Sequence, residues 1–558
     1  MIDCAEQNPL PAAAEFRRPP EVVMRLARMG SFHQTRLSFM RTLLRRLKRE
    51  QWRFKRNLWS IDAQGFGRAV YTLYGPERAY SLVAFSHDLP DHMRSDRVIA
   101  TAWDATFALY DGIPDAADLD RLEQNVPKQE AGRVSDSELS LSRANRSVRL
   151  WQHVVEALSA GRQPDREQLE AVGYLVRTTA VYGSGKFGAA DRLAIADRPE
   201  VSGPFQAELL SVWLIRSFAL DLVEHVAAMC GGETAVVIEP EMRRRIGVGN
   251  STGLGMAPFL INHPALLNNW MMAREEAIAR VRSLASAETE AIETFKHHFQ
   301  RARFNVSQWH SAHPLQIEKL AALGNDFNQM AGYIERESLV DDHPWDRFYR
   351  WAETQLSLEG QEQLVSLLLE PYGELVDGLT QCMDADEHLS FFIDGAMPLA
   401  RLREILESRC QWALQVDYDE PANRARFWYT SAEKLEPRVG ERFAEPGAEY
   451  ELPLAVGYDI KRMYGSLIAG PQDISTAEFL LAHPEHRHTT RRVQNLATHP
   501  YAEIQDNLIA ADMLPVDILR CKLSFFGATK FDPRSDRWVR ICMYQDAPFP
   551  HELLAAAP

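Results

Sequence analysis

Short blocks recur in the same order in two distant regions of the sequence, and this apparent internal repeat constrains the fold more than any other feature. The block Tyr182–Phe187 resembles Phe526–Phe531, and an Asp-Arg pair follows each of them. Matching positions and their offsets are Ala79 and Ala425 (346 residues), Glu138 and Glu478 (340 residues), and Lys186 and Lys530 (344 residues). A shared order at a nearly constant offset indicates a duplicated unit.

Duplication would determine where a site lies. Two diverged copies of one unit are expected to pack about a pseudo-two-fold axis, with their matching loops facing a common groove. Lys186 and Lys530 would then be pseudo-equivalent cations. The alternative is that short strand and loop patterns recur in any large protein without a common origin.

The order of the expected elements predicts a predominantly helical α+β protein. Strand patterns lie near both ends of the chain and helical patterns fill the centre, which suggests that the two ends share a sheet. We expect four parts: a tail (1–20), a first repeat unit with basic N-terminal helices (21–233), a helical connecting region with a glycine-rich loop (234–395) and a second repeat unit (396–558).

Local patterns predict particular elements. Ser135 precedes Glu138, and Ser475 precedes Glu478, at the spacing of a capping box, so both segments are expected to begin helices. The segment Cys521–Phe526 is expected to be a strand. One or two amphipathic helices are expected over residues 21–56, a further strand over 412–418, and a long helix over 265–303 with a break near 283–286.

Composition and charge are those of a globular protein. Hydrophobic residues make up 46% of the 558 residues, and the formal net charge is −15. The most apolar segment, Leu209–Met229, contains Arg216, Asp221 and Glu224, which predicts a buried helix rather than a membrane span. Six scattered cysteines without a C-x-x-C pair, and no visible signal peptide, indicate reduced thiols and a cytoplasmic location away from membranes.

Positive charge is concentrated in one segment. Residues 15–56 contain 13 Lys or Arg and 3 Asp or Glu, a local net charge of +10, so the remainder carries −25. A negative body disfavours non-specific nucleic-acid binding. We expect the basic segment to lie on this body; the alternative is RNA binding, with Trp52, Phe54 and Trp59 stacking on bases.

The segment 182–188 could bind an anion. Its glycines allow backbone N–H groups to converge, and Lys186 adds a charge, with the hydroxyls of Tyr182 and Ser184 beside it. It is not a P-loop, because Ala180 occupies the position of the first glycine and Phe187 that of the Ser or Thr that would hold magnesium. The alternative is a plain glycine turn with an exposed lysine.

A second loop, 243–256, looks most like a binding site, because three arginines precede four glycines and a polar Asn-Ser-Thr run. Polar groups of this kind can hold a carboxylate or a phosphate. The glycines could instead permit close packing of the loop, and their spacing does not fit a dinucleotide fingerprint. The expected substrate-binding residues are Arg245, Gly249, Asn250, Ser251, Thr252, Gly253 and Ser184.

Histidines cluster at His483, His486 and His488. Clustered histidines can bind a transition metal, but no H-E-x-x-H spacing exists and Pro484 interrupts a regular helix. The sequence favours a solvated helix start without a metal. His486 is kept as a candidate general acid or base.

These motifs favour an enzyme that acts by acid–base chemistry on a small anionic carboxylate or phosphate metabolite, bound between the repeat units. Lyase, isomerase or transferase chemistry fits better than NAD-dependent oxidation, because no dinucleotide motif is convincing. The expected catalytic residues are Lys186, Tyr182, Lys530 and His486. No cofactor is identified, and a homo-oligomer stays open. The alternatives are a non-catalytic helical scaffold and RNA binding through the basic segment.

Overall fold

The computed structural model describes residues 11–94, 102–127, 134–178, 195–251, 263–385, 392–420, 423, 427–430, 437–440, 452–453, 456–506, 520–528, 530–535 and 538–557. Only the backbone is described for 11–12, 427–430, 437–440, 452–453, 530–535, 538–540 and Ser251.

A mixed sheet of ten strands forms within these residues, in the order β11-β12-β7-β6-β5-β4-β3-β2-β1-β13. Successive strands from β1 to β6 are antiparallel, and β7 is parallel to β6. Strands β12 and β11 extend the sheet beyond β7, and β13 pairs in parallel with β1 at the other edge. The strands are β1 (Arg53–Ile61), β2 (Gly67–Tyr74), β3 (Ala79–Ser86), β4 (Ala105–Asp111), β5 (Glu138–Arg146), β6 (Tyr174–Thr178), β7 (Gly247–Ser251), β11 (Lys530–Ser535), β12 (Trp538–Met543) and β13 (Ala555–Ala556).

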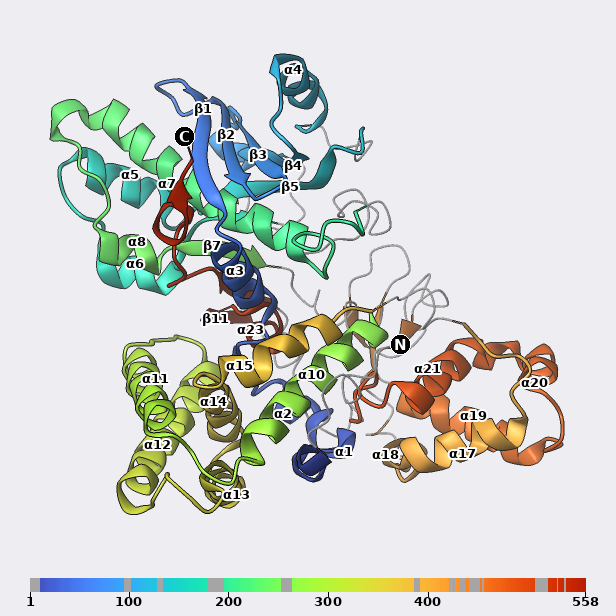
Figure 1. Ribbon diagram of the computed structural model, residues 1–558. Coiled ribbons are helices and arrows are strands. Elements are labelled where there is room, and N and C mark those ends of the chain that lie inside the picture. The colour runs from blue at the N-terminus through green and yellow to red at the C-terminus, as the bar shows by residue number, and fades with distance from the viewer. Residues whose placement is uncertain are drawn as a thin grey trace.

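Helices cover both faces of the sheet (Figure 1). Helix α7 (Gln206–Gly231) packs on one face, where Ser211 and Ser140 of β5 share a hydrogen bond of 2.6 Å. Helix α4 (Ala116–Asn125) packs on the other face, in a core that contains Val83. Since both faces are buried, β3 is a continuous apolar run rather than an alternating one.

A helical part lies below the sheet in Figure 1 and packs around α10. The gap between α10 and α11 confirms the expected break. The basic N-terminal segment packs here through three short helices, and its last helix also contacts α7. The helices are α1 (Pro20–Val23), α2 (Leu26–Met29), α3 (Phe39–Arg49), α10 (Pro264–Arg282), α11 (Thr289–Ser307), α12 (Pro314–Arg336), α13 (Pro344–Gln355) and α14 (Leu358–Leu369).

A third group of helices has a separate hydrophobic core (right in Figure 1). Its main helices are α17 (Leu399–Arg409), α18 (Gln411–Leu414), α19 (Gly457–Ala469), α20 (Thr476–Ala482) and α21 (Arg487–Thr498). A three-stranded sheet belongs to the same stretch of chain and consists of β8 (Phe427–Thr430), β9 (Pro437–Gly440) and β10 (Leu452–Pro453).

The predicted duplicated α+β fold is wrong. The segment after Ser135 becomes strand β5, whereas Ser475 caps helix α20 in a capping box, so the two supposed copies differ in kind. Strands from both ends of the chain do join, as expected, but they join a single sheet, and no second copy of a unit is present in the described residues. Glu138 explains the difference, because it is buried and ion-paired with Arg121 instead of capping a helix.

Three other local expectations are wrong for physical reasons. Cys521–Phe526 is helix α23, and a short apolar run that is buried on all sides cannot distinguish a helix from a strand. The expected strand over 412–418 begins within helix α18. The helical pattern over 21–56 ends with α3 at Arg49, and β1 begins at Arg53.

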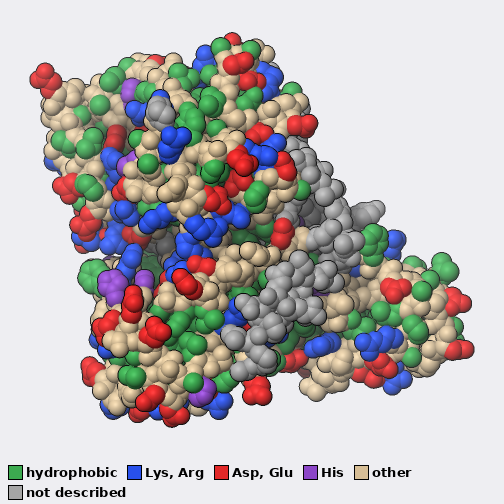
Figure 2. Space-filling model, viewed as in Figure 1, with side chains coloured by type: hydrophobic (Ala, Val, Ile, Leu, Met, Phe, Trp, Pro, Cys, Tyr) green, Lys and Arg blue, Asp and Glu red, His purple; other side chains and the backbone are tan. Residues whose placement is uncertain are grey.

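The basic segment lies on acidic side chains of the same chain, which confirms the self-docking interpretation for the arginines involved. Arg36 binds Asp377 at 2.6 Å, and Arg41 binds Glu370 through two contacts. Trp52 is 3% exposed and stacks on Tyr80 instead of facing solvent. Figure 2 shows Lys and Arg side chains gathered where the sheet part meets the helical part.

Two further expectations concern the environment of the chain. Among the described residues, no helix combines the length and apolar character that crossing a membrane requires. Cys382 is disulfide-bonded, so the expectation that all six thiols are reduced is wrong for this residue. Cys230, Cys410, Cys521 and Cys542 form no disulfide.

Candidate functional site

Helix α23 (Cys521–Phe526) joins the sheet to the helical part. Its Cys521 thiol donates to the backbone oxygen of Met29 at 3.3 Å, and the Ser524 backbone oxygen accepts from the Ser38 hydroxyl. On the same helix, the ring of Phe525 lies 5.0 Å from that of Trp270. These contacts fix α23 against elements that are several hundred residues away in sequence.

Lys522 projects from α23 toward the sheet. Its side chain is 2% exposed, and Nζ lies 3.4 Å from Oδ1 of Asn250, which is 1% exposed. The Nδ2 of Asn250 donates to the backbone oxygen of Thr178 at 3.0 Å. Asn250 is on β7 and Thr178 ends the neighbouring strand β6, so the amide is held by the sheet with its oxygen toward the lysine.

The environment of Lys522 favours the uncharged amine. Burial lowers the pKa of Lys522 well below its ordinary value, because a low-dielectric interior disfavours the ammonium form. A neutral lysine amine can accept a proton or attack a carbonyl group, which an exposed lysine does poorly at neutral pH. Perturbed lysines of this kind concentrate at functional sites.

Aromatic side chains surround α23 and the N-terminus of α7. Phe205, the residue before α7, has φ 57° and ψ 7°, a left-handed conformation that is strained for a side chain of this size. Its ring contacts Phe526 at 5.2 Å and His263 at 6.5 Å between centroids. The neighbourhood of Lys522 is therefore apolar, with His263 as a titratable group at its margin.

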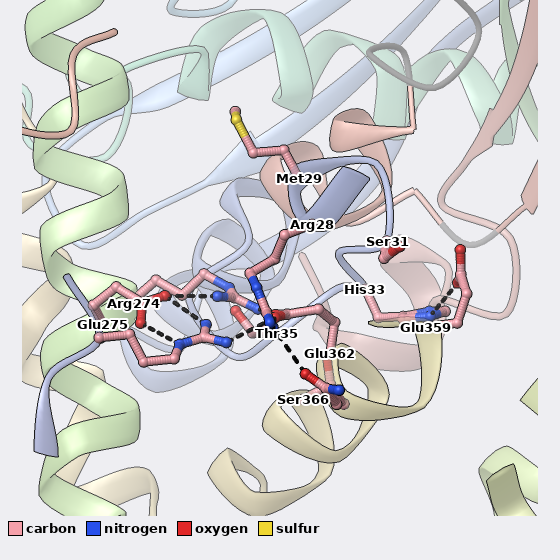
Figure 3. Close-up of polar contacts among 12 residues, drawn as sticks. Arg28, Met29, Ser31, His33, Thr35, Arg274, Glu275, Glu359, Glu362 and Ser366 are labelled. Carbon is pink, nitrogen blue, oxygen red and sulfur yellow. Dashed lines mark hydrogen bonds and ion pairs between the residues drawn. The ribbon is translucent and has the colours of Figure 1, made fainter. Parts of the chain in front are cut away.

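A buried ion network lies within the helical part (Figure 3). Glu362 of α14 accepts from Arg18 and Arg28 at 2.7 Å each, and also from Arg274. Arg18 in addition binds both carboxylate oxygens of Glu275 at 2.7 Å. Glu275 and Glu362 thus share three guanidinium groups. In Figure 3 the side chains of this network converge from α2, α10 and α14.

A second buried ion cluster, centred on Glu359 of the same helix α14, reaches the start of α23. Arg520, the residue before α23, binds Glu359 through two contacts, and His33 and Lys319 lie 3.1 and 3.3 Å from the same carboxylate. Burial opposes ionisation of Glu359, but Arg520 and His33 together outweigh this effect and hold the pKa of Glu359 well below its ordinary range.

Glu362 is affected in the same way. Burial alone would raise the pKa of Glu362, but the guanidinium groups of Arg18 and Arg274 lower it by more, so the pKa is below its ordinary value. Glu359 and Glu362 therefore stay ionised near neutral pH, and their arginine partners do not release protons. Both ion clusters therefore suit a rigid framework better than a centre of proton transfer, and the Glu359 cluster holds the start of α23.

The structure does not bring Arg245 and Asn250 together. Arg245 precedes β7 and pairs with Asp546 at 3.5 Å, whereas Asn250 lies near the other end of the strand, roughly 15 Å along it. The position of Gly249 is explained by packing, since an added Cβ would lie 2.7 Å from the ring of Tyr174. This supports the close-packing interpretation for that glycine.

The other expected site residues fall into three groups. The backbone of Lys530 pairs with Cys542, which pairs with Gly249, so Lys530 is about 10 Å across the sheet from Gly249. His486 is buried in the separate core of α17–α21, where Nε2 lies 3.0 Å from the Ser466 hydroxyl. Those outside the described residues are Tyr182, Ser184, Lys186, Thr252 and Gly253, and the side chain of Ser251 is not described either.

Lys522 was missed by the sequence reasoning, although a signal was present. A single lysine inside the apolar run Cys521–Phe526 is unusual, because lysines are almost never fully buried unless they are paired. The expected strand would have placed Lys522 on an alternating face and concealed its burial. The chain matches no known protein family, no curated protein and no solved structure.

Proposed function

We propose that this chain is an enzyme that acts by acid–base chemistry on a small anionic carboxylate or phosphate metabolite, with Lys522 as the group that moves the proton. The observation that carries the proposal is the buried contact between Lys522 and Asn250. In this proposal Lys522 takes the catalytic role that the sequence assigned to Lys186 and Lys530. The reason is that its buried position supplies the dry surroundings that lysine acid–base chemistry needs.

The properties of a buried amine limit the reaction class. A neutral amine in a low-dielectric site takes up a proton most readily when the same step creates an anion beside it. Abstraction from a carbon or oxygen acid has this property: the C–H or O–H bond breaks, the proton moves to Nζ, and the electron pair stays on the substrate. Lyases, isomerases and some transferases begin in this way.

Asn250 has a positioning role in this proposal. Its amide is fixed by the Thr178 backbone oxygen, so its Oδ1 accepts from the lysine and holds Nζ in one place. The same Oδ1 also stabilises the ammonium form of Lys522 that exists after the proton has been transferred, because a hydrogen bond from a charged donor is stronger.

The test begins with a library of carboxylate and phosphate metabolites screened by thermal shift on the full chain. With the ligand or substrate found, Lys522→Met is expected to lower kcat by about 10²–10⁴-fold, the usual contribution of a general acid or base. Lys296→Met, which removes a lysine on α11 that is 44% exposed, is the matched control and is expected to leave kcat unchanged. An active Lys522→Met variant with a parental kcat would overturn the assignment.

Location and assembly are part of the proposal. We propose a cytoplasmic enzyme that acts on a free metabolite rather than on nucleic acid. Four cysteines that form no disulfide fit this reducing compartment, whereas the disulfide at Cys382 does not, so cell fractionation followed by detection of the chain decides the location. Light scattering of the purified chain tests whether it forms a homo-oligomer.

A further inference from the structure

The turn between α20 and α21 brings three metal-binding side chains together. His483, Glu485 and His486 each offer one ligand atom, and these atoms all lie within 4.8 Å of one another. Glu485 Oε1 is 3.4 Å from His483 Nδ1 and 3.8 Å from His486 Nε2. We propose that this turn binds a divalent transition-metal ion of the zinc type, a function separate from that of Lys522.

The spacing of the three atoms is close to what such an ion requires. Tetrahedral zinc with nitrogen and oxygen ligands at about 2.0–2.1 Å places those ligands about 3.3 Å apart. The separations of Glu485 Oε1 from the two histidine nitrogens exceed this value by about 0.1 and 0.5 Å, and the separation between the two nitrogens needs to shorten by at most about 1.5 Å. Small side-chain rotations achieve this without moving the backbone.

The backbone of the turn is already fixed. The His483 N–H donates to the Phe479 backbone oxygen at 2.9 Å, and the His486 N–H donates to that of His483 at 3.1 Å. Pro484, between the ligands, has a restricted φ, and a capping box at Ser475 and Glu478 stabilises the preceding helix. Little conformational entropy therefore remains to be lost when an ion binds.

Both imidazole rings are also held in place by packing. The Phe479 ring is stacked with His486 at 5.9 Å with an interplanar angle of 6°, and it lies 5.0 Å from the ring of His483. Phe479 is itself 2% exposed in the core of this part of the chain. A rigid supporting shell of this kind is what a metal site needs to keep its ligands in geometry.

The donor set determines the class of ion. Two imidazoles and one carboxylate suit zinc, copper, nickel or iron, whereas calcium and magnesium prefer all-oxygen sites. His483 and Glu485 are 40% and 49% exposed, so an ion can enter from solvent and water can complete its coordination. The Ser466 hydroxyl, now 3.0 Å from His486 Nε2, would give up that nitrogen to the metal.

The experiment is a calorimetric titration of the metal-free full chain with Zn²⁺, followed by Co²⁺ for its visible absorption spectrum. We expect one tight site that His483→Ala and Glu485→Gln each weaken by more than about tenfold, since even loss of a group that only supports a ligand costs tenfold or more. Both replaced side chains are substantially exposed, so the variants are expected to remain folded, which circular dichroism checks.

His488→Ala is the matched control, because it removes a histidine of the same segment that is not part of the cluster. Parental Zn²⁺ affinity in this control, together with weakened binding in the other two variants, supports the site. Equal affinity in the parent, His483→Ala and Glu485→Gln would overturn it, and so would tighter binding of Ca²⁺ than of Zn²⁺. Loss of Lys522-dependent catalysis does not bear on this result, because the two proposals have separate readouts.

Discussion

Replacing Lys522 by Met tests the physical basis of the candidate site without knowledge of any substrate. The substitution removes the amine and keeps most of the side-chain volume, in a position that is 2% exposed. At neutral pH the unfolded chain carries the protonated amine in water, and burial of Lys522 opposes that charge, so folding costs free energy at this position; we therefore expect Lys522→Met to be more stable than the parent at neutral pH.

The pH dependence of this difference can be worked out from the lowered pKa of Lys522. In the unfolded chain the amine titrates near its ordinary value of about 10.4, and in the folded protein it titrates well below that value. Between the two pKa values the unfolded chain binds one more proton than the folded protein. The parent therefore gains about 1.4 kcal/mol of stability per pH unit as the pH rises through this window, and Lys522→Met does not.

The assay is urea unfolding of both proteins between about pH 8 and pH 9.5, followed by tryptophan fluorescence. The advantage of Lys522→Met should shrink as the pH rises over this interval. The control Lys296→Met, at a largely exposed lysine, should show a difference from the parent that does not change with pH. A pH-independent difference for Lys522→Met would refute the reasoning, because it would mean that Lys522 is protonated in both states.

Three further predictions concern the framework. Glu362→Gln should destabilise the protein by about 3–5 kcal/mol, because it leaves buried guanidinium groups without a carboxylate; urea unfolding measures this, and a loss below about 1 kcal/mol would contradict it. The lowered pKa of Glu362 in the folded protein stabilises it fully above the unfolded-state pKa of about 4.3, and this stabilisation should be lost as the pH falls through the folded-state pKa. Acid unfolding of the parent and of Glu362→Gln measures the loss. Gly249→Ala should cost about 1–3 kcal/mol through overlap with the Tyr174 ring, and Tyr174→Leu in the same chain should recover part of the loss, unless the overlap is relieved elsewhere. Ser475→Ala should cost about 1 kcal/mol in thermal unfolding through loss of the helix cap, and an unchanged transition would exclude the capping role.

The sequence predicted elements best where periodicity and length agree. The long apolar stretch that became α7 was recognisable, because it carries an unambiguous pattern over many residues. Glu138 and Glu478 carried the same local signal but fold differently, since strand pairing at β5 overrides a capping pattern. Resemblance between short blocks therefore reflected local chemistry and not a repeated unit.

The candidate site was only partly predictable for a related reason. Asn250 could be selected because a polar residue in a glycine-rich stretch needs partners when it is buried. Lys522 carried only the weak signal of a single lysine in an apolar run, because its burial depends on the contacts of α23 with Met29 and Ser38 and on its own contact with Asn250, which no sequence periodicity encodes. The arginines of the basic segment were expected to meet acidic side chains, but which carboxylate each one binds is determined by the fold.

The two ends of the ten-stranded sheet are completed by residues made late in synthesis. Strand β1 receives its outer neighbour only when Ala555 has emerged, and β7 receives β12 only after Met543. A nascent chain that already contains β1 to β7 would thus expose two open strand edges while several hundred residues are still being added. Such edges invite pairing with other chains, so the growing polypeptide depends on chaperones or on rapid completion to avoid association.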